Sequence, residues 1–251
     1  MKVIILAAGK GTRLAPFTDD LPKCLIKLFD KSLLEMQIDN FKDCRINDII
    51  IVTGYKNEKI IFPGIKKEKN ENFSSTGMNE SLFCVKNELN DSIIVSYSDI
   101  IYDKNIIKQL IEFKGDIGIA VRTKWKENYN NRDLHPISEA ENVLFENEKI
   151  LKIKKNIIEK KEKQEIGEFL GLMKISKNRC RILLETYSNL KKTHIGKFHS
   201  SKSLETAYLT DMIQEMINLN NKVEIIHTEG KWFEVDTMQD VNNVREKIGN
   251  N

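Results

Sequence analysis

Residues 3–14 read V-I-I-L-A-A-G-K-G-T-R-L, and Pro22-Lys23 follows them after a short interval. The first four residues are typical of a buried strand, and the small residues after them form a turn with glycine at positions 9 and 11. Because glycine lacks a Cβ, backbone N–H groups in such a turn can approach phosphate oxygens, while Arg13 and Lys23 supply positive charge. This stretch therefore predicts an α/β fold with a site for a nucleoside triphosphate.

Two common glycine loops do not fit this stretch. A Walker loop has four residues between its glycines, whereas a single residue separates Gly9 from Gly11 here. A dinucleotide-binding loop needs a third Gly or Ala where this chain has Leu14. A dinucleotide oxidoreductase is therefore disfavoured, although the Gly-x-Gly turn alone is also compatible with an ordinary strand and turn.

The longer string from Leu6 to Leu14, followed by Lys23, resembles the signature L-A-A-G-x-G-[TS]-R-[LM] with a downstream P-K of the sugar-nucleotidyltransferase superfamily. This resemblance implies a Rossmann-like, three-layer α/β fold with a mainly parallel central sheet. It also implies transfer of a nucleotidyl group to a phosphorylated acceptor with release of pyrophosphate. The residues that it assigns to the nucleotide are Leu6, Ala7, Ala8, Gly9, Gly11, Thr12, Arg13 and Lys23, with Ala7 and Ala8 facing the base.

Composition limits the class of protein. The chain has 251 residues, 40% of them hydrophobic, which suits a single nucleotidyltransferase domain over residues 1–251. Its 40 basic and 37 acidic residues give a net charge of +3 without a basic patch, so no nucleic-acid partner is expected. No apolar run approaches the roughly 20 residues of a membrane span, and we expect no cleaved signal segment before the first strand. We expect a cytoplasmic monomer or homodimer without a membrane partner.

The cysteines suggest no metal site. Cys24, Cys44, Cys84 and Cys180 lack paired metal-ligand spacing and have apolar neighbours. We expect buried free thiols with no part in function.

Strand and helix patterns alternate along the first half of the chain. Three sets of apolar residues have the spacing of a helical face: Leu34, Ile38 and Phe41; Leu82, Val85 and Leu89; and Ile106, Leu110 and Phe113. Strands are expected at 48–54, 93–95 and 116–123. This rhythm predicts parallel strands joined by right-handed crossovers. Ligands gather beyond the carboxyl ends of such strands, where the glycine loop, Gly54-Tyr55 and Ser98-Asp99 fall. Residues 124–167 break the pattern and predict a small β-hairpin elaboration over the acceptor side of the sheet.

Two aspartates stand where hydrophobic stretches end. Asp99 follows residues 93–98 and Asp236 follows residues 232–235, positions that by themselves more often hold a turn or helix-cap residue. Members of the superfamily that this chain resembles place one metal aspartate after a central strand and a second in a C-terminal W-x-[ED]-[IV]-[DG]-[TS] segment, which residues 232–237 match. The resemblance therefore implies Mg²⁺ held by Asp99 and Asp236, with Lys23 and Arg13 as further catalytic residues. Ser98 replaces a glycine found in many members, and Asp240 is expected to be structural.

The W-x-E-[IV]-D form of the C-terminal segment, in a short chain, is similar to cytidylyltransferases that activate phosphocholine and related phosphorylated molecules. This similarity implies CTP as donor and an acceptor like phosphocholine, aminoethylphosphonate or phosphoglutamine, in cell-surface polysaccharide or capsule biosynthesis. It extends to Gly54-Tyr55, residues 77–82 and residues 169–171. Further nucleotide-binding candidates are therefore Gly54, Tyr55, Asn79 and Ser81.

The acceptor candidates are Glu168, Gly171, Tyr208, Asp211 and Trp232. A choline-type ligand would need an aromatic cage, for which Trp125, Tyr129, Tyr208 and Trp232 are available, although the helical spacing of Tyr208 from Leu204 and Met212 is simpler to explain by core packing. An amino-acid-like acceptor would need charged partners such as Arg122, Lys124, Arg132, Glu168 and Asp211. His135, His194, His199 and His227 lack metal spacing, and no catalytic role is predicted for them.

Two other functions remain open. A hexose-1-phosphate nucleotidyltransferase using UTP, GTP or dTTP would share the metal chemistry and differ in base and acceptor. A non-catalytic nucleotide-sensing subunit would keep the loop but lose a metal aspartate or the lysine, and the presence of Lys23, Asp99 and Asp236 argues against it.

Overall fold

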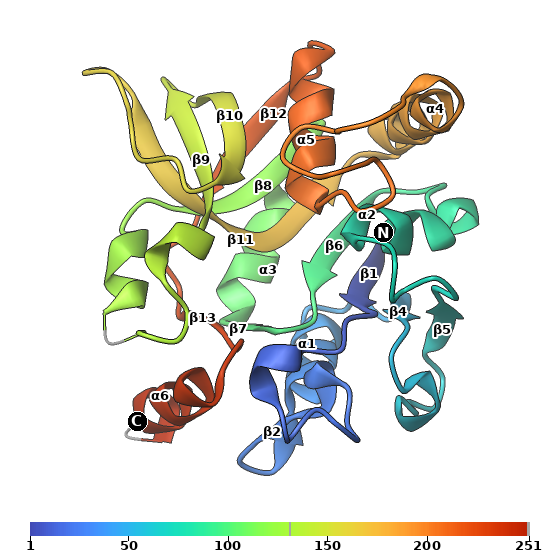
Figure 1. The fold of residues 1–251 in the computed structure, drawn as a ribbon, viewed down its shortest axis with the longest axis vertical. Helices are drawn as coiled ribbons and strands as arrows, with labels where there is room; N and C mark the ends of the chain where they lie inside the picture. Colours follow the sequence, from blue (N-terminus) through green and yellow to red (C-terminus); the bar gives the residue numbers. More distant parts are fainter. Residues whose placement is uncertain (131, 250–251) are drawn as a thin grey trace.

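A computed structural model describes residues 1–130 and 132–249, and its main feature is a nine-stranded sheet (Figure 1). The strands of this sheet are β1 (Lys2–Ala7), β4 (Ile49–Thr53), β5 (Lys66–Lys69), β6 (Ile93–Tyr97), β8 (Ile117–Arg122), β9 (Glu141–Glu146), β10 (Lys149–Lys155), β11 (Glu165–Ile175) and β12 (Val223–His227). They lie in the order β5-β4-β1-β6-β11-β8-β12-β10-β9.

Two small sheets and six α-helices complete the described part of the chain. The small sheets pair β2 (Lys27–Leu28) with β3 (Lys31–Ser32), and β7 (Ile100–Tyr102) with β13 (Trp232–Glu234). The helices are α1 (Leu33–Asp43), α2 (Met78–Cys84), α3 (Lys104–Glu112), α4 (Lys177–Thr193), α5 (Leu209–Asn218) and α6 (Met238–Gly249). Short 3₁₀ turns are η1 (Thr12–Leu14), η2 (Lys23–Leu25), η3 (Asn57–Lys59), η4 (Lys86–Glu88), η5 (Trp125–Tyr129) and η6 (Ile137–Glu139).

The sheet is mixed: the expected parallel pairing holds for β5, β4, β1 and β6 and again for β8 with β12, whereas β11 and the β9–β10 hairpin pair antiparallel. Strands β4, β5 and β6 run parallel to β1, but β11 is antiparallel to both β6 and β8. Strand β11 follows the β9–β10 hairpin in the chain and pairs antiparallel with β9 as well. The insertion thus reverses the chain direction in the middle of the sheet.

The hairpin predicted within residues 124–167 is formed by β9 and β10. Its turn residues Asn147 and Glu148 have φ angles of 48° and 64°, the left-handed backbone that a two-residue hairpin turn requires. The hairpin does not lie over the sheet but extends it, because β10 pairs with β12 while β9 pairs with β11. These pairings curl this end of the sheet on itself, at the upper left of Figure 1.

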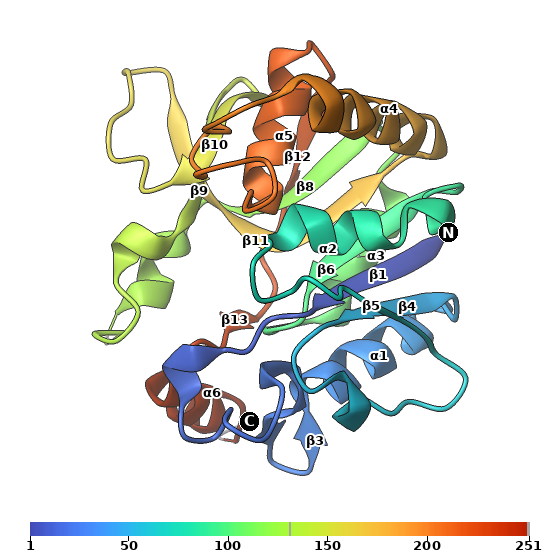
Figure 2. The same ribbon diagram turned by 45° about the vertical axis from the view of Figure 1, so that its right-hand side comes forward.

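Helices cover both faces of the sheet, as the three-layer prediction requires (Figures 1 and 2). Helices α1 and α3 pack together on one face, and α2, α4 and α5 lie on the other. The Phe83 and Tyr187 rings stack at 3.6 Å between centroids and join α2 to α4. Strand β1 runs through the centre, and its Val3, Ile4 and Ile5 are fully buried, because a strand covered on both faces must be apolar throughout.

Two smaller expectations need correction. The helix expected from Leu82 to Leu89 ends at Cys84 and continues only as the turn η4. All four cysteines are free thiols, but only Cys24 and Cys180 are buried, while Cys44 is partly exposed and Cys84 is exposed at the end of α2. None of the described helices combines the length and the apolar character needed to cross a bilayer.

Candidate active site

Two aspartates from distant parts of the sequence lie side by side. Asp99 follows β6, and Asp236 follows β13. Strand β13 pairs antiparallel with β7, which begins just after Asp99, and the Val235 N–H donates to the Asp99 carbonyl at 2.9 Å. This pairing brings the two predicted metal aspartates to one place near the end of the central strands.

Lys23 lies between these two carboxylates. Its Nζ donates to Asp99 Oδ2 at 2.7 Å and also to Asp236 Oδ1. Burial would lower the pKa of Lys23, but the two carboxylates outweigh it and hold the pKa well above its usual range. The cluster therefore holds a buried positive charge between two carboxylates.

Asp236 is in contact with further cations. Arg13 Nη2 lies 3.0 Å from Asp236 Oδ2, with the Arg13 side chain half exposed and the Asp236 side chain buried. Burial would raise the pKa of Asp236, yet Lys23, a hydrogen bond from His135 and Arg13 hold it well below its usual range. Asp236 is thus ionised throughout the physiological pH range.

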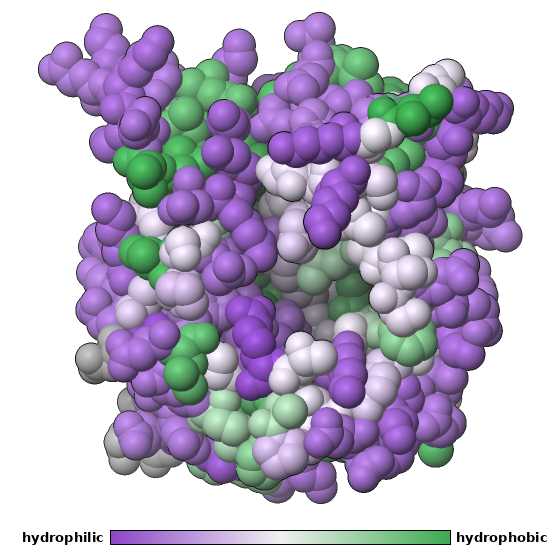
Figure 3. Space-filling view, viewed as in Figure 1, coloured by the Kyte–Doolittle hydropathy of each residue, from purple (hydrophilic) through white to green (hydrophobic). Residues whose placement is uncertain are grey.

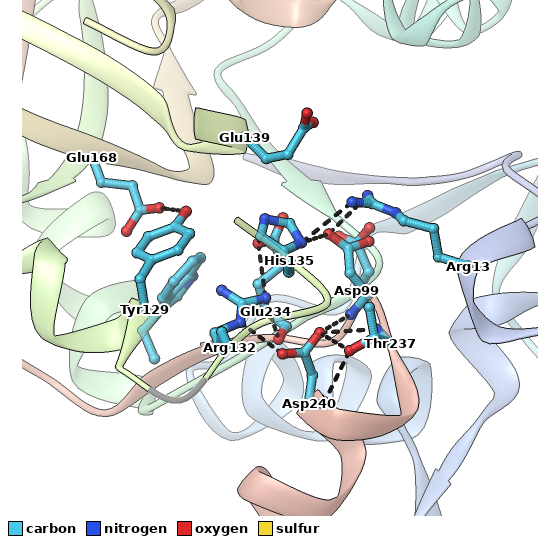
Figure 4. Close-up of polar contacts among 12 residues, drawn as sticks. Arg13, Asp99, Tyr129, Arg132, His135, Glu139, Glu168, Glu234, Thr237 and Asp240 are labelled. Atoms are coloured by element: carbon cyan, nitrogen blue, oxygen red, sulfur yellow. Dashed lines mark hydrogen bonds and ion pairs between the residues drawn. The ribbon is translucent and has the colours of Figure 1, made fainter. Parts of the chain in front are cut away.

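His135 and Glu234 complete the cluster, and the sequence analysis assigned neither of them to it. His135 Nδ1 lies 2.8 Å from Asp236 Oδ2, and its Nε2 lies 3.4 Å from Glu234 Oε2 (Figure 4). Ligand atoms of His135, Glu234 and Asp236 all fall within 4.8 Å of one another, a spacing that can hold a metal ion. Burial raises the pKa of Glu234 well above its usual range, and Asp236 and Asp99 add to the shift. Glu234 could have been found, because it occupies the acidic position of the C-terminal segment, but nothing near His135 in the sequence marks its partners.

Arg132 fastens the segment that carries His135. Its Nε donates to Asp240 Oδ1 at 2.6 Å, and both side chains are buried. The other oxygen, Asp240 Oδ2, accepts from the backbone N–H groups of Asp236 and Thr237 at 3.0 and 2.9 Å. Asp240 therefore has the structural role expected at the start of α6, and it also anchors Arg132, three residues before His135, next to the aspartates.

The glycine loop leads from the buried strand to an open turn. Leu6, Ala7 and Ala8 are buried, whereas a Cβ on Gly9 would have no atom within 4 Å among the described residues other than Gly9 and its two chain neighbours. Gly11 has a φ of 71°, and a Cβ there would lie 2.7 Å from the Cβ of Lys23. A glycine is thus needed for the loop to pass over Lys23, while Thr12 on the loop is exposed.

Gly54 and Tyr55 lie against the same loop. The Tyr55 N–H donates to the Ala8 carbonyl at 3.1 Å, and a Cβ on Gly54 would lie 2.6 Å from that carbonyl oxygen. Lys10 Nζ lies 5.5 Å from the centroid of the Tyr55 ring. The end of β4 therefore supports the loop, as expected from the shared edge of the sheet.

Asn79 and Ser81 differ in how they are held. Asn79 is fully buried at the start of α2, and neither atom of its side-chain amide has a hydrogen-bond partner among the described residues. The Ser81 hydroxyl accepts from Asn70 Nδ2 at 3.1 Å and donates to the Gly77 carbonyl at 3.4 Å. Ser81 is thus engaged within the protein, and nucleotide binding by both residues stays a prediction.

A cavity of 150 Å³ opens next to the aspartates, and Figure 3 shows the hollow at the centre of this face. Four of the five acceptor candidates line it, namely Glu168, Gly171, Tyr208 and Trp232. Other lining residues that the sequence did not indicate include Tyr97, Glu139, Glu141 and Lys155. The expectation that Tyr208 packs in the core is wrong, because it precedes α5 and is 40% exposed.

Asp211 does not reach this cavity. It is buried and accepts hydrogen bonds from the backbone N–H groups of Tyr208 at 3.0 Å and Ser200 at 2.9 Å and from the Ser201 hydroxyl at 2.6 Å. Asp211 therefore caps the start of α5, and its assignment to acceptor binding is not supported.

The chain belongs to the nucleotidyl transferase family. The family model described as "Nucleotidyl transferase" matches residues 2–131, which confirms the resemblance seen in the glycine loop. A relative covering nearly the whole chain supports the same assignment.

That relative is a CTP:phosphoglutamine cytidylyltransferase from Campylobacter jejuni, 30% identical over 255 residues, covering 96% of this chain and 98% of the relative. A choline-phosphate cytidylyltransferase from Streptococcus pneumoniae is 38% identical over 112 residues, covering 43% of this chain and 48% of the relative. Among solved structures, a CTP:phosphocholine cytidylyltransferase from Streptococcus pneumoniae shares the fold with a TM-score of 0.75, at 23% identity and with 98% of each chain covered.

Proposed function

We propose that this protein transfers the cytidylyl group of CTP to the phosphate of a small molecule and releases pyrophosphate. The observation that carries the proposal is the cluster of Lys23, Asp99 and Asp236 beside both the glycine loop and the cavity. A triphosphate needs positive charge and exposed backbone N–H groups, which this side of the cluster offers. The similarity over nearly the whole chain to a CTP-dependent relative supports CTP as the donor.

A divalent cation fits the carboxylates of this cluster. Lys23 Nζ already sits between Asp99 and Asp236, so this pair holds a cation. Asp99 Oδ1 is buried without a hydrogen-bond partner among the described residues, and Glu234 adds a third carboxylate. Mg²⁺ prefers carboxylate oxygens and usually shares them with substrate phosphates. We therefore assign Mg²⁺ to Asp99, Asp236 and Glu234, where it would neutralise charge between the two reacting phosphates.

The reaction that follows is an in-line displacement. An oxygen of the acceptor phosphate forms a bond to the α-phosphorus of CTP, while the bond from that phosphorus to the β-phosphate oxygen breaks and pyrophosphate leaves. A phosphate monoester is nucleophilic near neutral pH, so no covalent intermediate on the protein is needed. Lys23 and Arg13 supply fixed positive charge for the phosphates, and the glycine loop supplies N–H donors.

The acceptor is assigned to the cavity next to Asp99 and Asp236. Its walls bring Glu168, Tyr208 and Trp232 within reach of a small molecule whose phosphate lies at the cluster. The fit to a small acceptor agrees with the modest cavity volume of 150 Å³. Cytoplasmic location, a monomeric or homodimeric state and a role in cell-surface polysaccharide or capsule biosynthesis belong to the same proposal.

Magnesium-dependent pyrophosphate release tests this function. CTP, UTP, GTP, ATP and dTTP would each be combined with phosphocholine, phosphoethanolamine, 2-aminoethylphosphonate, phosphoglutamine, glycerol phosphate and glucose 1-phosphate. Release with CTP and an acceptor that is not a sugar phosphate is expected. Release only with UTP, GTP or dTTP and a hexose 1-phosphate would indicate the other catalytic class, and nucleotide binding without any release would favour a sensor.

A further inference from the structure

One end of the cavity, lined by Glu141 and Glu168, has carboxylates without a paired cation among the described residues. The cavity is lined by Asp99, Glu139, Glu141, Glu168, Glu234 and Asp236, against the permanent charges of Arg13 and Lys155. Lys155 Nζ pairs with Glu139 at 2.9 Å, and Arg13 pairs with Asp236. Neither Glu141 nor Glu168 forms an ion pair with a residue in 1–130 or 132–249. Burial raises the pKa of Glu141, although Lys155, which forms its ion pair with Glu139, lowers it.

Glu168 is the more deeply buried of the two. Its side chain is on β11, the residue is 2% exposed, and one oxygen accepts from the Tyr129 hydroxyl (Figure 4). The other oxygen, Oε2, has no hydrogen-bond partner among the described residues. Burial raises the pKa of Glu168 to about 7, although Tyr129, Arg132 and Asn128 each lower it. Burying a carboxylate oxygen without a hydrogen bond costs free energy, and a ligand that donates a hydrogen bond to it would offset this cost.

Glu141 is held differently. Tyr97 donates its hydroxyl to Glu141 Oε2 at 2.9 Å, and Thr210 donates to Oε1 at 3.1 Å. Both donors are neutral, so they orient the carboxylate without cancelling its charge. Burial raises the pKa of both carboxylates, so a cation that enters this end of the cavity would be attracted by their ionised forms and would favour them.

Most of the aromatic rings considered for a cage around a quaternary ammonium already face a cation of the chain. A cation of the chain already lies over three of the four candidate rings: Lys126 over Trp125 at 5.8 Å, Arg132 over Tyr129 at 5.2 Å and Lys155 over Tyr208 at 4.8 Å from the ring centroid. The rings of Trp232, Tyr97 and Phe169 also line the cavity, but aromatic rings leave the unpartnered oxygen of Glu168 without a hydrogen-bond donor. A charged group that donates hydrogen bonds fits this end of the cavity better than one that offers only methyl groups.

We infer that the acceptor is a phosphate ester of a primary amine, whose ammonium group donates a hydrogen bond to Glu168 Oε2 and is attracted by Glu141. This inference rests on the proposed function for the place of the acceptor phosphate. The carboxylates Glu141 and Glu168 then select the substrate. A primary ammonium group can donate a hydrogen bond to the buried oxygen of Glu168, whereas a neutral polyol or a trimethylammonium group offers no charged donor.

Calorimetric binding of acceptors separates this inference from the catalytic proposal. The full chain would be titrated with phosphoethanolamine, phosphocholine and glycerol 3-phosphate in the presence of Mg²⁺ and α,β-methylene-CTP, which cannot turn over. We expect phosphoethanolamine to bind at least about tenfold more tightly than the other two, the ratio that one charge-assisted hydrogen bond provides. This experiment measures binding and not turnover, so it tests the choice of acceptor even if the pyrophosphate assay fails.

Two substitutions sharpen the test. Glu168→Gln keeps the shape and removes the charge, and it is expected to weaken phosphoethanolamine binding about 10-fold to 100-fold while leaving glycerol 3-phosphate unchanged. Glu141→Gln is expected to act in the same direction with a smaller effect, and it serves if the first variant does not fold. Glu165→Gln, an exposed change on the same strand, is the matched control and should bind like the wild type. Equal or weaker binding of phosphoethanolamine compared with phosphocholine, or no loss in either carboxylate variant, would overturn the inference.

Discussion

Replacing Asp99 with asparagine is the substitution that should most affect activity with least change in shape. Asp99 Oδ2 lies 2.7 Å from Lys23 Nζ, and its other oxygen is buried without a partner among the described residues. The amide introduced by Asp99→Asn would keep the packing but remove a full charge and a carboxylate oxygen from the proposed metal site. The loss of one group that stabilises transition-state charge costs about 2.7–4 kcal/mol, or about 100-fold to 1,000-fold in kcat.

The same substitution should have a smaller effect on stability. Lys23 keeps its bond to Asp236 when Asp99 is changed, so its buried charge is not left alone. We expect the free energy of unfolding to fall by about 1–3 kcal/mol, the range for weakening one buried hydrogen bond to a charged group. Urea denaturation of both proteins measures this difference.

The assay is pyrophosphate release from CTP with saturating Mg²⁺ and the acceptor that the wild type uses fastest. Asp39→Asn is the matched control, because Asp39 also lies 2.7 Å from a lysine, Lys31, but both side chains are about half exposed. We expect the control to keep wild-type turnover. A folded Asp99→Asn protein with near-normal kcat would refute the role given to this carboxylate.

Four other predictions concern the cavity and its supports. Gly171→Ala should lower the free energy of unfolding by about 1–3 kcal/mol more than Gly196→Ala, because both have positive φ but only at Gly171 would a Cβ meet Tyr97, at 2.7 Å. Arg132→Ala should cost about 3–5 kcal/mol by leaving its buried carboxylate partner unpaired, as urea denaturation would show. The free energy of unfolding of the wild type should fall by about 3 kcal/mol as pH rises from about 4.5 to about 7, because in this range Glu168 loses its proton in the unfolded chain but keeps it in the folded protein. Glu168→Gln should remove this fall. Chelation by EDTA should abolish pyrophosphate release, and excess Mg²⁺ should restore it.

Each of these predictions has a contradicting result. Equal stability of the two glycine variants would show that the contact with Tyr97 relaxes freely. For Arg132, the control is Arg181→Ala, because the exposed pair of Arg181 with Glu185 at 3.8 Å should contribute little to stability. Similar losses of unfolding free energy in both variants would show that the buried pair of Arg132 and Asp240 is not a special anchor. A stability profile of Glu168→Gln that still falls between these pH values would place the titrating group elsewhere. Full activity in EDTA would refute the metal assignment.

The parts of the site that the sequence predicts are those next to strands. The strand β1 with its glycine turn, Asp99 after β6 and Asp236 after β13 all stand where a hydrophobic run ends, so local pattern and family signature place them correctly. Lys23 follows the loop at the spacing that the signature requires, and the fold brings it onto both aspartates.

The parts that the sequence missed depend on contacts between distant segments. His135 reaches Asp236 because Arg132 fastens its segment to Asp240, and no periodicity in residues 124–140 records that bond. Tyr208 is predicted as an acceptor candidate, but its spacing also fits a helical face, and only the start of α5 after it shows that the ring lies at the cavity. The direction of β11 likewise depends on how the hairpin joins the sheet rather than on its own residues.

The most direct test of the central claim follows the phosphorus atoms of CTP. Purified protein with Mg²⁺ and phosphoethanolamine or another phosphorylated acceptor would be given CTP radiolabelled at either the α- or the γ-phosphorus. Cytidylyl transfer predicts that the α-label appears in a product of CMP and acceptor, and that the γ-label appears in pyrophosphate. Transfer of the γ-label to the acceptor, or product formed only from UTP, GTP or dTTP with a hexose 1-phosphate, would contradict the account.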